Sequence, residues 1–168
     1  MAIPSGTNET RHSASAPPGR RTSERHAIAR VHRQHLEIVE HLRDLEAHLA
    51  QVSGLPHPGE VRNHIAGRLD RFQSELAEHF AEEERVGFVP HATALAPRLT
   101  YRARRVLSQH DLLRVELSKV VSTLARGTAD WDQVRESFEV FTALLLEHEE
   151  RENELINEAH LDDLGGGG

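Results

Sequence analysis

Apolar residues recur at steps of three and four in separate segments of the chain, and this spacing limits the possible folds more than any other sequence feature. Such a step is the period of one face of an α-helix, and repeated apolar seams pack inward in helical bundles. The segments are separated by SGLPHPG at 53–59, by the stretch between Pro90 and Pro97, and by RGTAD at 126–130. We therefore predict an all-α fold, an antiparallel up-down-up-down four-helix bundle with segments of roughly 25 to 30 residues.

The two ends of the chain differ in composition from the part between them. Residues 1–22, MAIPSGTNETRHSASAPPGRRT, are rich in Ser, Thr, Pro, Gly and Arg, and the chain closes with GGGG. Segments of this kind do not bury enough apolar surface to offset the entropy of ordering. We expect a disordered N-terminal tail at 1–22, one bundle domain at 23–160 and a flexible C-terminal tail at 161–168.

Composition excludes several classes of protein. The 27 Asp and Glu residues outnumber the 20 Lys and Arg residues, which disfavours a nucleic-acid partner. The absence of cysteine excludes disulfides, zinc sites with cysteine ligands and iron–sulfur clusters. Neither a signal-type hydrophobic stretch nor an apolar run near the roughly 18 residues of a membrane span is present. We expect no membrane partner and a cytoplasmic location, and the sequence leaves any protein partner open.

Polar side chains interrupt the apolar seams at matching places in all four segments. The residues are His35, His79, Glu83, His110, His148 and Glu152. In HFAEEER (79–85) and in HEEREN (148–153), histidine and glutamate stand four positions apart, so each pair stacks on one helical face. Counting from the helix ends at about 1.5 Å per residue places the six side chains at one depth in an antiparallel bundle.

A buried layer of this kind needs compensation, because an unpartnered buried histidine or glutamate costs roughly several kcal/mol. A single core histidine is most often a hydrogen-bonded structural residue, and a single His-x-x-x-Glu is usually a surface pair. A metal-free network of charged side chains would be dehydrated and marginal. Because spacing and depth agree in all four segments, we predict instead that the six residues bind two metal ions in the core, and zinc or manganese would suit the same donors as iron.

The remaining histidines and the arginine runs are interpreted as structural or surface residues. His41, His48 and His64 fall off the seams, His57 and His91 lie in predicted loops, and His12 lies in the tail. His32 flanks the seam one turn before His35 and could substitute for it or contact it. The RARR run at 102–105 is expected to be solvated surface, whereas Phe72, Phe138 and Phe141 are expected to be core and to keep the layer dry.

Histidine in the first segment, HFAEEE in the second, QHDLL in the third and HEEREN in the fourth together resemble the hemerythrin-like, or HHE cation-binding, domain. The resemblance covers about residues 24–160. It implies two irons, oxo- or hydroxo-bridged, that are also bridged by Glu83 and Glu152 and have the four histidines as terminal ligands. The rival ferritin-like site needs two Glu-x-x-His motifs, and this chain has that spacing only at Glu9 to His12.

The resemblance implies binding of dioxygen or a reactive oxygen species, for sensing, storage or detoxification. Oxygen carriers of the family have another histidine four residues after the first one of helix three, and Arg114 stands in that place here. Each metal would then keep an open position, which favours redox turnover, unless His32, water or a nearby glutamate fills one. Arg114 could donate to a bound anion or extend outward. The alternatives are a di-iron enzyme with peroxide-decomposing or oxidase activity and a metal-stabilised regulatory interaction module whose tail contacts a partner.

Overall fold

The computed structural model describes the chain except for residues 1–17, 53–58, 86–92, 95, 127–129 and 166–168. Its long helices are α1 (Pro18–Val52), α2 (Gly59–Arg85), α5 (Gln109–Ala125) and α6 (Trp131–Gly165). A 3-10 turn, η1 (Pro97–Leu99), and a short helix, α4 (Thr100–Leu107), precede α5. The described residues contain no strand, so the prediction of an all-α fold is confirmed.

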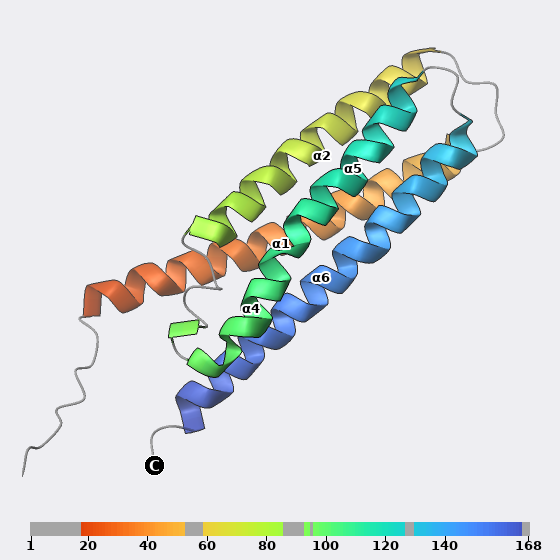
Figure 1. The fold of residues 1–168 in the computed structure, drawn as a ribbon. Coiled ribbons are helices and arrows are strands. Elements are labelled where there is room, and N and C mark those ends of the chain that lie inside the picture. Colours follow the sequence, from red (N-terminus) through yellow and green to blue (C-terminus); the bar gives the residue numbers. More distant parts are fainter. Residues whose placement is uncertain (1–17, 53–58, 86–92, 95, 127–129, 166–168) are drawn as a thin grey trace, which may run out of the picture.

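The four long helices pack side by side as a bundle (Figure 1). Helix α1 contacts α2 and α6, and α5 also contacts both α2 and α6, so each long helix has two long neighbours. The colours in Figure 1 show consecutive long helices running in alternating directions. Among the described residues, no helix is long and apolar enough to cross a membrane.

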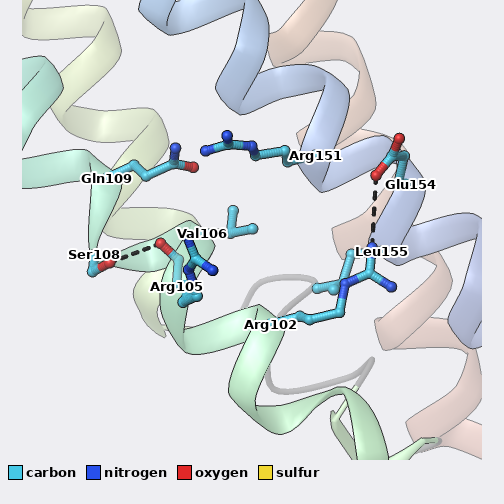
Figure 2. A pocket seen from close by; sticks show the side chains of 8 residues that line it. All are labelled: Arg102, Arg105, Val106, Ser108, Gln109, Arg151, Glu154 and Leu155. Atoms are coloured by element: carbon cyan, nitrogen blue, oxygen red, sulfur yellow. Dashed lines mark hydrogen bonds and ion pairs between the residues drawn. The ribbon is translucent and has the colours of Figure 1, made fainter.

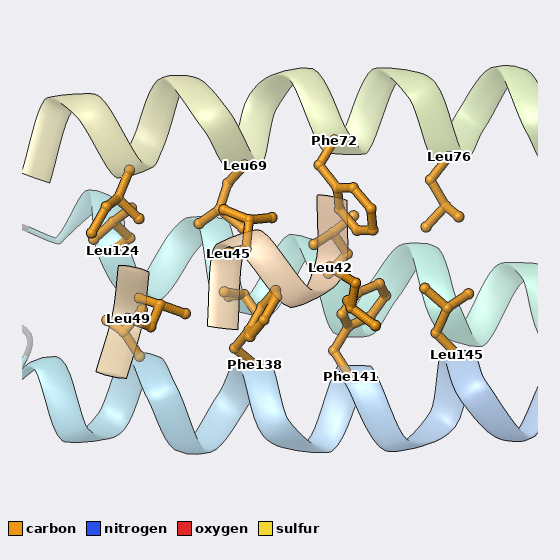
Figure 3. Packing of buried hydrophobic residues seen from close by; sticks show 14 of the residues in the cluster. Leu42, Leu45, Leu49, Leu69, Phe72, Leu76, Leu124, Phe138, Phe141 and Leu145 are labelled. Atoms are coloured by element: carbon orange, nitrogen blue, oxygen red, sulfur yellow. The ribbon is translucent and has the colours of Figure 1, made fainter. Parts of the chain in front are cut away.

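The apolar seams meet in one main core cluster. Leu42, Leu45, Leu69, Phe72 and Phe141 are at most 2% exposed, and Figure 3 shows side chains of this cluster pointing toward one another from facing helices. Burying a side chain of this size stabilises the fold by about 1.5–3 kcal/mol. The helical period read from the sequence therefore describes the packed faces correctly.

A second, smaller apolar cluster closes the other end of the bundle. It contains Leu99 and Ala103 from the η1–α4 segment and Leu155 and Ala159 from α6. On α6, Leu145 belongs to the main cluster and Leu155 to the small one. The polar layer at positions 148–152 therefore lies between two apolar clusters, as expected for a polar layer inside the core.

The helices extend beyond the predicted bounds at both ends. Helix α1 begins at Pro18, inside the expected tail at 1–22, and α6 continues to Gly165, inside the expected tail at 161–168. Proline suits the first turn of a helix because it has no N–H to donate, and the Arg, Ser and Glu residues that follow it are compatible with a helix. The rest of both tails lies outside the described residues, as do most residues of the predicted breaks.

The third segment is divided where one helix was predicted. Ser108 separates α4 from α5: its hydroxyl donates to the carbonyl of Arg105 at 2.7 Å, and its backbone N–H donates to the carbonyl of Arg104 at 3.0 Å. A serine hydroxyl that bonds a carbonyl of the preceding turn competes with the helical ladder and often bends a helix. The break places His110 in the first turn of α5. Pro97 opens η1, where a proline suits the first helical turn.

Candidate metal centre

The structure brings together all six polar residues that the sequence placed on the seams. They come from α1, α2, α5 and α6, and their exposures are 5% for His35, 1% for His79, and 0% for Glu83, His110, His148 and Glu152. Each one replaces an apolar residue on the inner face of its helix. The burial expected from periodicity alone is therefore observed at every position.

The side chains form two groups that share a residue. His35, His79, Glu83 and Glu152 make one group, and Glu83, His110 and His148 make the other, with the possible ligand atoms of each group within 4.8 Å of one another. Glu83 belongs to both groups and can therefore contact two cations at once. Glu152 belongs only to the first group, which differs from the symmetric pair of bridges that the resemblance implied.

The two oxygens of Glu83 face different histidines. Its Oε1 lies 3.1 Å from Nε2 of His35 and 2.9 Å from Nε2 of His79. Its Oε2 lies 3.3 Å from Nε2 of His110. The carboxylate therefore stands between the two groups, and the spacing of four residues between His79 and Glu83 places both side chains on one face of α2.

Several buried polar atoms of the layer lack hydrogen bonds within the described part of the protein. They include Nε2 of His79, His110 and His148, Oε2 of Glu83 and both carboxylate oxygens of Glu152. Leaving such atoms unsatisfied in an apolar interior costs roughly 1–3 kcal/mol each, whereas a cation converts each into a bond. The nitrogen and oxygen donors suit iron, zinc or manganese, so the residues present fit a metal centre.

Burial and close contacts shift the protonation of the layer strongly. Burial alone would raise the pKa of Glu83, but the close contacts of its carboxylate with the imidazoles of His110, His35 and His79 outweigh burial and hold this pKa far below its usual range. Burial and the nearby His110 lower the pKa of His148 to about 3. Glu83 is thus ionised and His148 neutral at neutral pH, which are the forms that bind a metal ion.

His35 and Glu152 are shifted in the opposite sense. Burial favours neutral His35, but close contacts with the carboxylates of Glu152 and Glu83 and the charge of Glu149 outweigh burial and raise its pKa to about 10. Burial, offset in part by His35 and reinforced by the charge of Glu83, raises the pKa of Glu152 to about 8. Without a metal ion, His35 and Glu152 therefore carry protons that a bound cation would displace.

In three of the histidines, Nδ1 also lies close to a side-chain oxygen of a residue outside the six. The contacts are His35 with Glu149 Oε2 at 3.1 Å, His110 with Glu84 Oε1 at 2.9 Å, and His148 with Gln109 Oε1 at 3.4 Å. An acceptor at one ring nitrogen fixes the tautomer and leaves the other nitrogen free to bind a metal ion. In all three rings, Nε2 is the nitrogen that remains available to bind a metal ion.

Sequence reasoning missed two buried residues of the site, Glu149 and Phe80. Glu149 is 6% exposed and contacts His35, and Phe80 is 0% exposed and stacks on His110. Both immediately follow a seam histidine. A helix buries positions i, i+3 and i+4 on one face, so a wider seam would have included 149 beside 148 and 80 beside 79.

The other histidines lie where the sequence placed them, as far as they are described. His32, His41 and His64 are exposed, and His41 pairs with Glu75 at 2.6 Å. Half-buried His48 contacts the backbone carbonyl of Asp44 at 2.7 Å. His12, His57 and His91 lie outside the described residues.

Arg114 extends toward the surface of the bundle. Its guanidinium pairs with Glu84 at 3.0 Å and with Asp111 at 3.1 Å, and it lies 5.3 Å from the ring of Phe80. Of the two positions considered for this side chain, the outward one is the one observed.

The fold and the site define the class of protein: a helical bundle with a buried cluster of histidines and carboxylates that is able to hold metal cations. The family model of the hemerythrin HHE cation binding domain matches residues 26–159, and the chain therefore belongs to this family. No curated protein and no solved structure matches the chain.

Proposed function

We propose that the protein is a non-haem di-iron protein that binds dioxygen or a reactive oxygen species. The observation that carries the proposal is the pair of buried donor groups that share Glu83. Two ions separated by one carboxylate are the arrangement that these groups support best. The bound irons would supply reversible binding of, or electron exchange with, a small oxygen species, and the protein residues supply the donors and the dry surroundings.

Each proposed ligand has a defined part in holding the irons. His35 and His79 would hold one ion, His110 and His148 the other, Glu83 would contribute to both, and Glu152 would contribute to the ion of the first group. The acceptors at Nδ1 of His110 and His148 keep these rings in one tautomer, and Glu149 lies 3.1 Å from Nδ1 of His35. Burial excludes water from the remaining sides of the layer.

A cavity on the α1–α6 side gives a small ligand a route to this layer. Its volume is about 520 Å³, and its lining includes His35, Glu149, His32 and Asn153. The side chains of His35 and Glu149 are each 7% exposed, whereas those of His79 and Glu83 are 1% and 0% exposed. This opening is large enough for dioxygen or peroxide and supports the binding of small molecules.

A second candidate function is turnover of peroxide or oxidation of a small molecule at the same centre. The group of Glu83, His110 and His148 has one residue fewer than the other group, and Arg114 pairs with Glu84 and Asp111 at the surface. An ion in the smaller group has fewer protein donors and therefore more open positions. Open positions favour redox turnover over reversible carriage.

The decisive experiment is metal analysis with absorption spectroscopy on full-length protein produced with added iron. We expect about two irons per chain, because two donor groups are present. A reversible change in the visible spectrum on exposure to oxygen favours the binder, and rapid oxygen evolution from peroxide favours the enzyme. His148→Ala should remove either signal, whereas the surface variant His64→Ala should retain it. Finding one metal ion or none per chain would contradict the proposal.

A further inference from the structure

A second cavity, separate from the one at His35, lies against α4, the start of α5 and α6. Its volume is about 320 Å³, and Figure 2 shows its lining: Arg102, Arg105, Val106, Ser108, Gln109, Arg151, Glu154 and Leu155. The break at Ser108 shapes one wall of this cavity. None of the proposed metal ligands belongs to the lining.

The lining of this cavity is basic, although the chain as a whole has a net charge of −7. Three arginines face a single carboxylate, that of Glu154. Two of them, Arg102 and Arg105, come from the RARR run that was expected to be solvated surface. Val106, which is 4% exposed, adds an apolar patch to the wall, and the fully buried Leu155 lies beneath it. A concave site with an apolar wall and a few convergent charges is typical of small-molecule pockets.

Two of the arginines have donors to spare. Arg102 is held by Glu158 and by Glu154, so its charge is largely matched. Arg151 contacts Glu147 at 2.5 Å through a single terminal nitrogen, and a guanidinium has five N–H donors. Within the described part of the chain, Arg105 has no ion pair. Arg105 is therefore the arginine with unmatched charge, and Arg151 keeps unused N–H donors beside its ion pair with Glu147.

We propose that this cavity binds a small organic anion that carries a phosphate or carboxylate group. The guanidinium groups of Arg105 and Arg151 hold the oxyanion, because their planar N–H forks match carboxylate and phosphate oxygens. The apolar part of the ligand lies against the part of the wall formed by Val106 and the aliphatic stems of the arginines. The volume of about 320 Å³ exceeds what a bare inorganic anion fills, which favours an organic body.

The cavity also contacts the metal layer through one residue. Gln109 lines the cavity, and its Oε1 lies 3.4 Å from Nδ1 of His148. Figure 2 shows Gln109 and Arg151 extending toward one another. A ligand at Arg151 therefore reaches the residue that orients the His148 ring. This step rests on the proposed function: the anion acts on the iron centre as an effector, from behind His148, and is not an iron ligand.

Calorimetric titration of the full-length, metal-loaded protein tests the pocket. The probes are phenyl phosphate and benzoate, with inorganic phosphate for comparison, at low salt. We expect both organic anions to bind more tightly than inorganic phosphate. The double variant Arg105→Gln/Arg151→Gln should bind them at least roughly tenfold more weakly, because charge-assisted hydrogen bonds are lost. The matched control Arg104→Gln/Arg135→Gln changes two arginines of the same helices that do not line the cavity, and should bind as the unchanged protein does.

Three results would overturn the proposal of an anion site: no binding of either organic anion, equal loss in both double variants, or binding unchanged by the loss of Arg105 and Arg151. The last would place the anion on the metal ions themselves. The effector step has its own measurement, a shift of the visible absorption bands on anion binding that is lost in Gln109→Ala. Absence of the shift with intact calorimetric binding overturns that step alone. Failure of the proposed di-iron function would appear separately, as missing iron.

Discussion

The phenyl ring of Phe80 lies parallel to the imidazole of His110, with ring centroids 4.0 Å apart and an angle of 7° between the planes. The same phenyl ring meets His148 edge-on, at 5.7 Å and 83°. Phe80 is 0% exposed. One aromatic side chain thus contacts both histidines of the smaller donor group and excludes water from that side of the layer.

Replacement of Phe80 by alanine should strongly destabilise the protein. The loss of apolar contacts and the cavity left behind should lower the free energy of unfolding by about 3–5 kcal/mol. Urea denaturation monitored by circular dichroism measures this change. Tyr101→Ala is the control, because Tyr101 is 71% exposed and its loss should change stability by no more than about 0.5 kcal/mol. A change below about 1 kcal/mol for Phe80→Ala would contradict the packing seen here.

Glu83→Gln should reduce the binding of both metal ions. The residue belongs to both donor groups, and a neutral amide cannot provide two anionic oxygens. His35→Ala, by contrast, removes a donor of one group only and should reduce metal content toward one ion per chain. Metal analysis after dialysis against a weak chelator measures both effects.

A matched control for Glu83→Gln is available on the same helix. Glu75 of α2 pairs with exposed His41 at the surface, and Glu75→Gln should leave metal content unchanged. Equal metal content in Glu83→Gln and in the unchanged protein would show that the carboxylate does not bridge the two groups.

Glu149→Gln should weaken the binding of the ion held by His35. Oε2 of Glu149 lies 3.1 Å from Nδ1 of His35, and loss of a carboxylate beside a histidine ligand typically lowers metal affinity by about 10–100-fold. Burial raises the pKa of the Glu149 carboxyl, so the neutral amide should not destabilise the metal-free fold. Competitive titration with a chromophoric chelator measures the affinity. Glu150→Gln, at the exposed neighbouring position, should leave it unchanged.

The sequence predicted the bundle and the six polar residues of the layer because both depend on helical period. His35 and His110 were found because each interrupts an otherwise apolar seam, and burial within the structure agrees at 5% and 0% exposure. Relative depth was predictable because antiparallel helices of similar length align their middles.

Features that depend on contacts between helices were not predictable from one sequence. The contact of Glu149 with His35 joins α6 to α1, and its sequence signal is only a position beside His148. The RARR run resembles an ordinary solvated face, and only the break at Ser108 and the packing of α6 turn Arg102 and Arg105 into a cavity wall. The start of the first helix was also predicted too late in the chain, because composition alone did not show that α1 begins at Pro18.

The metal-free protein should become less stable as pH rises from 7 to 8. The pKa of His35 is raised from 6.5 to about 10 and that of Glu152 from 4.5 to about 8, so in this window the folded state holds protons that the unfolded state has released. Stability therefore falls with rising pH, by roughly 1–3 kcal/mol over the unit. The lowered pKa of His148, about 3, contributes little here, because His148 is largely neutral in both states.

Metal affinity should change with pH in the opposite direction to the stability of the metal-free protein. Metal ions bind deprotonated His35 and Glu152, so metal binding releases protons and apparent affinity increases from pH 7 to pH 8. Urea denaturation of the chelator-treated protein and metal titration at both pH values measure the two trends. Metal-free His35→Gln should lose much of the pH dependence of stability, whereas exposed His64→Gln should keep it. A metal-free protein that is more stable at pH 8 would contradict the raised pKa values, because both shifts require the opposite sign.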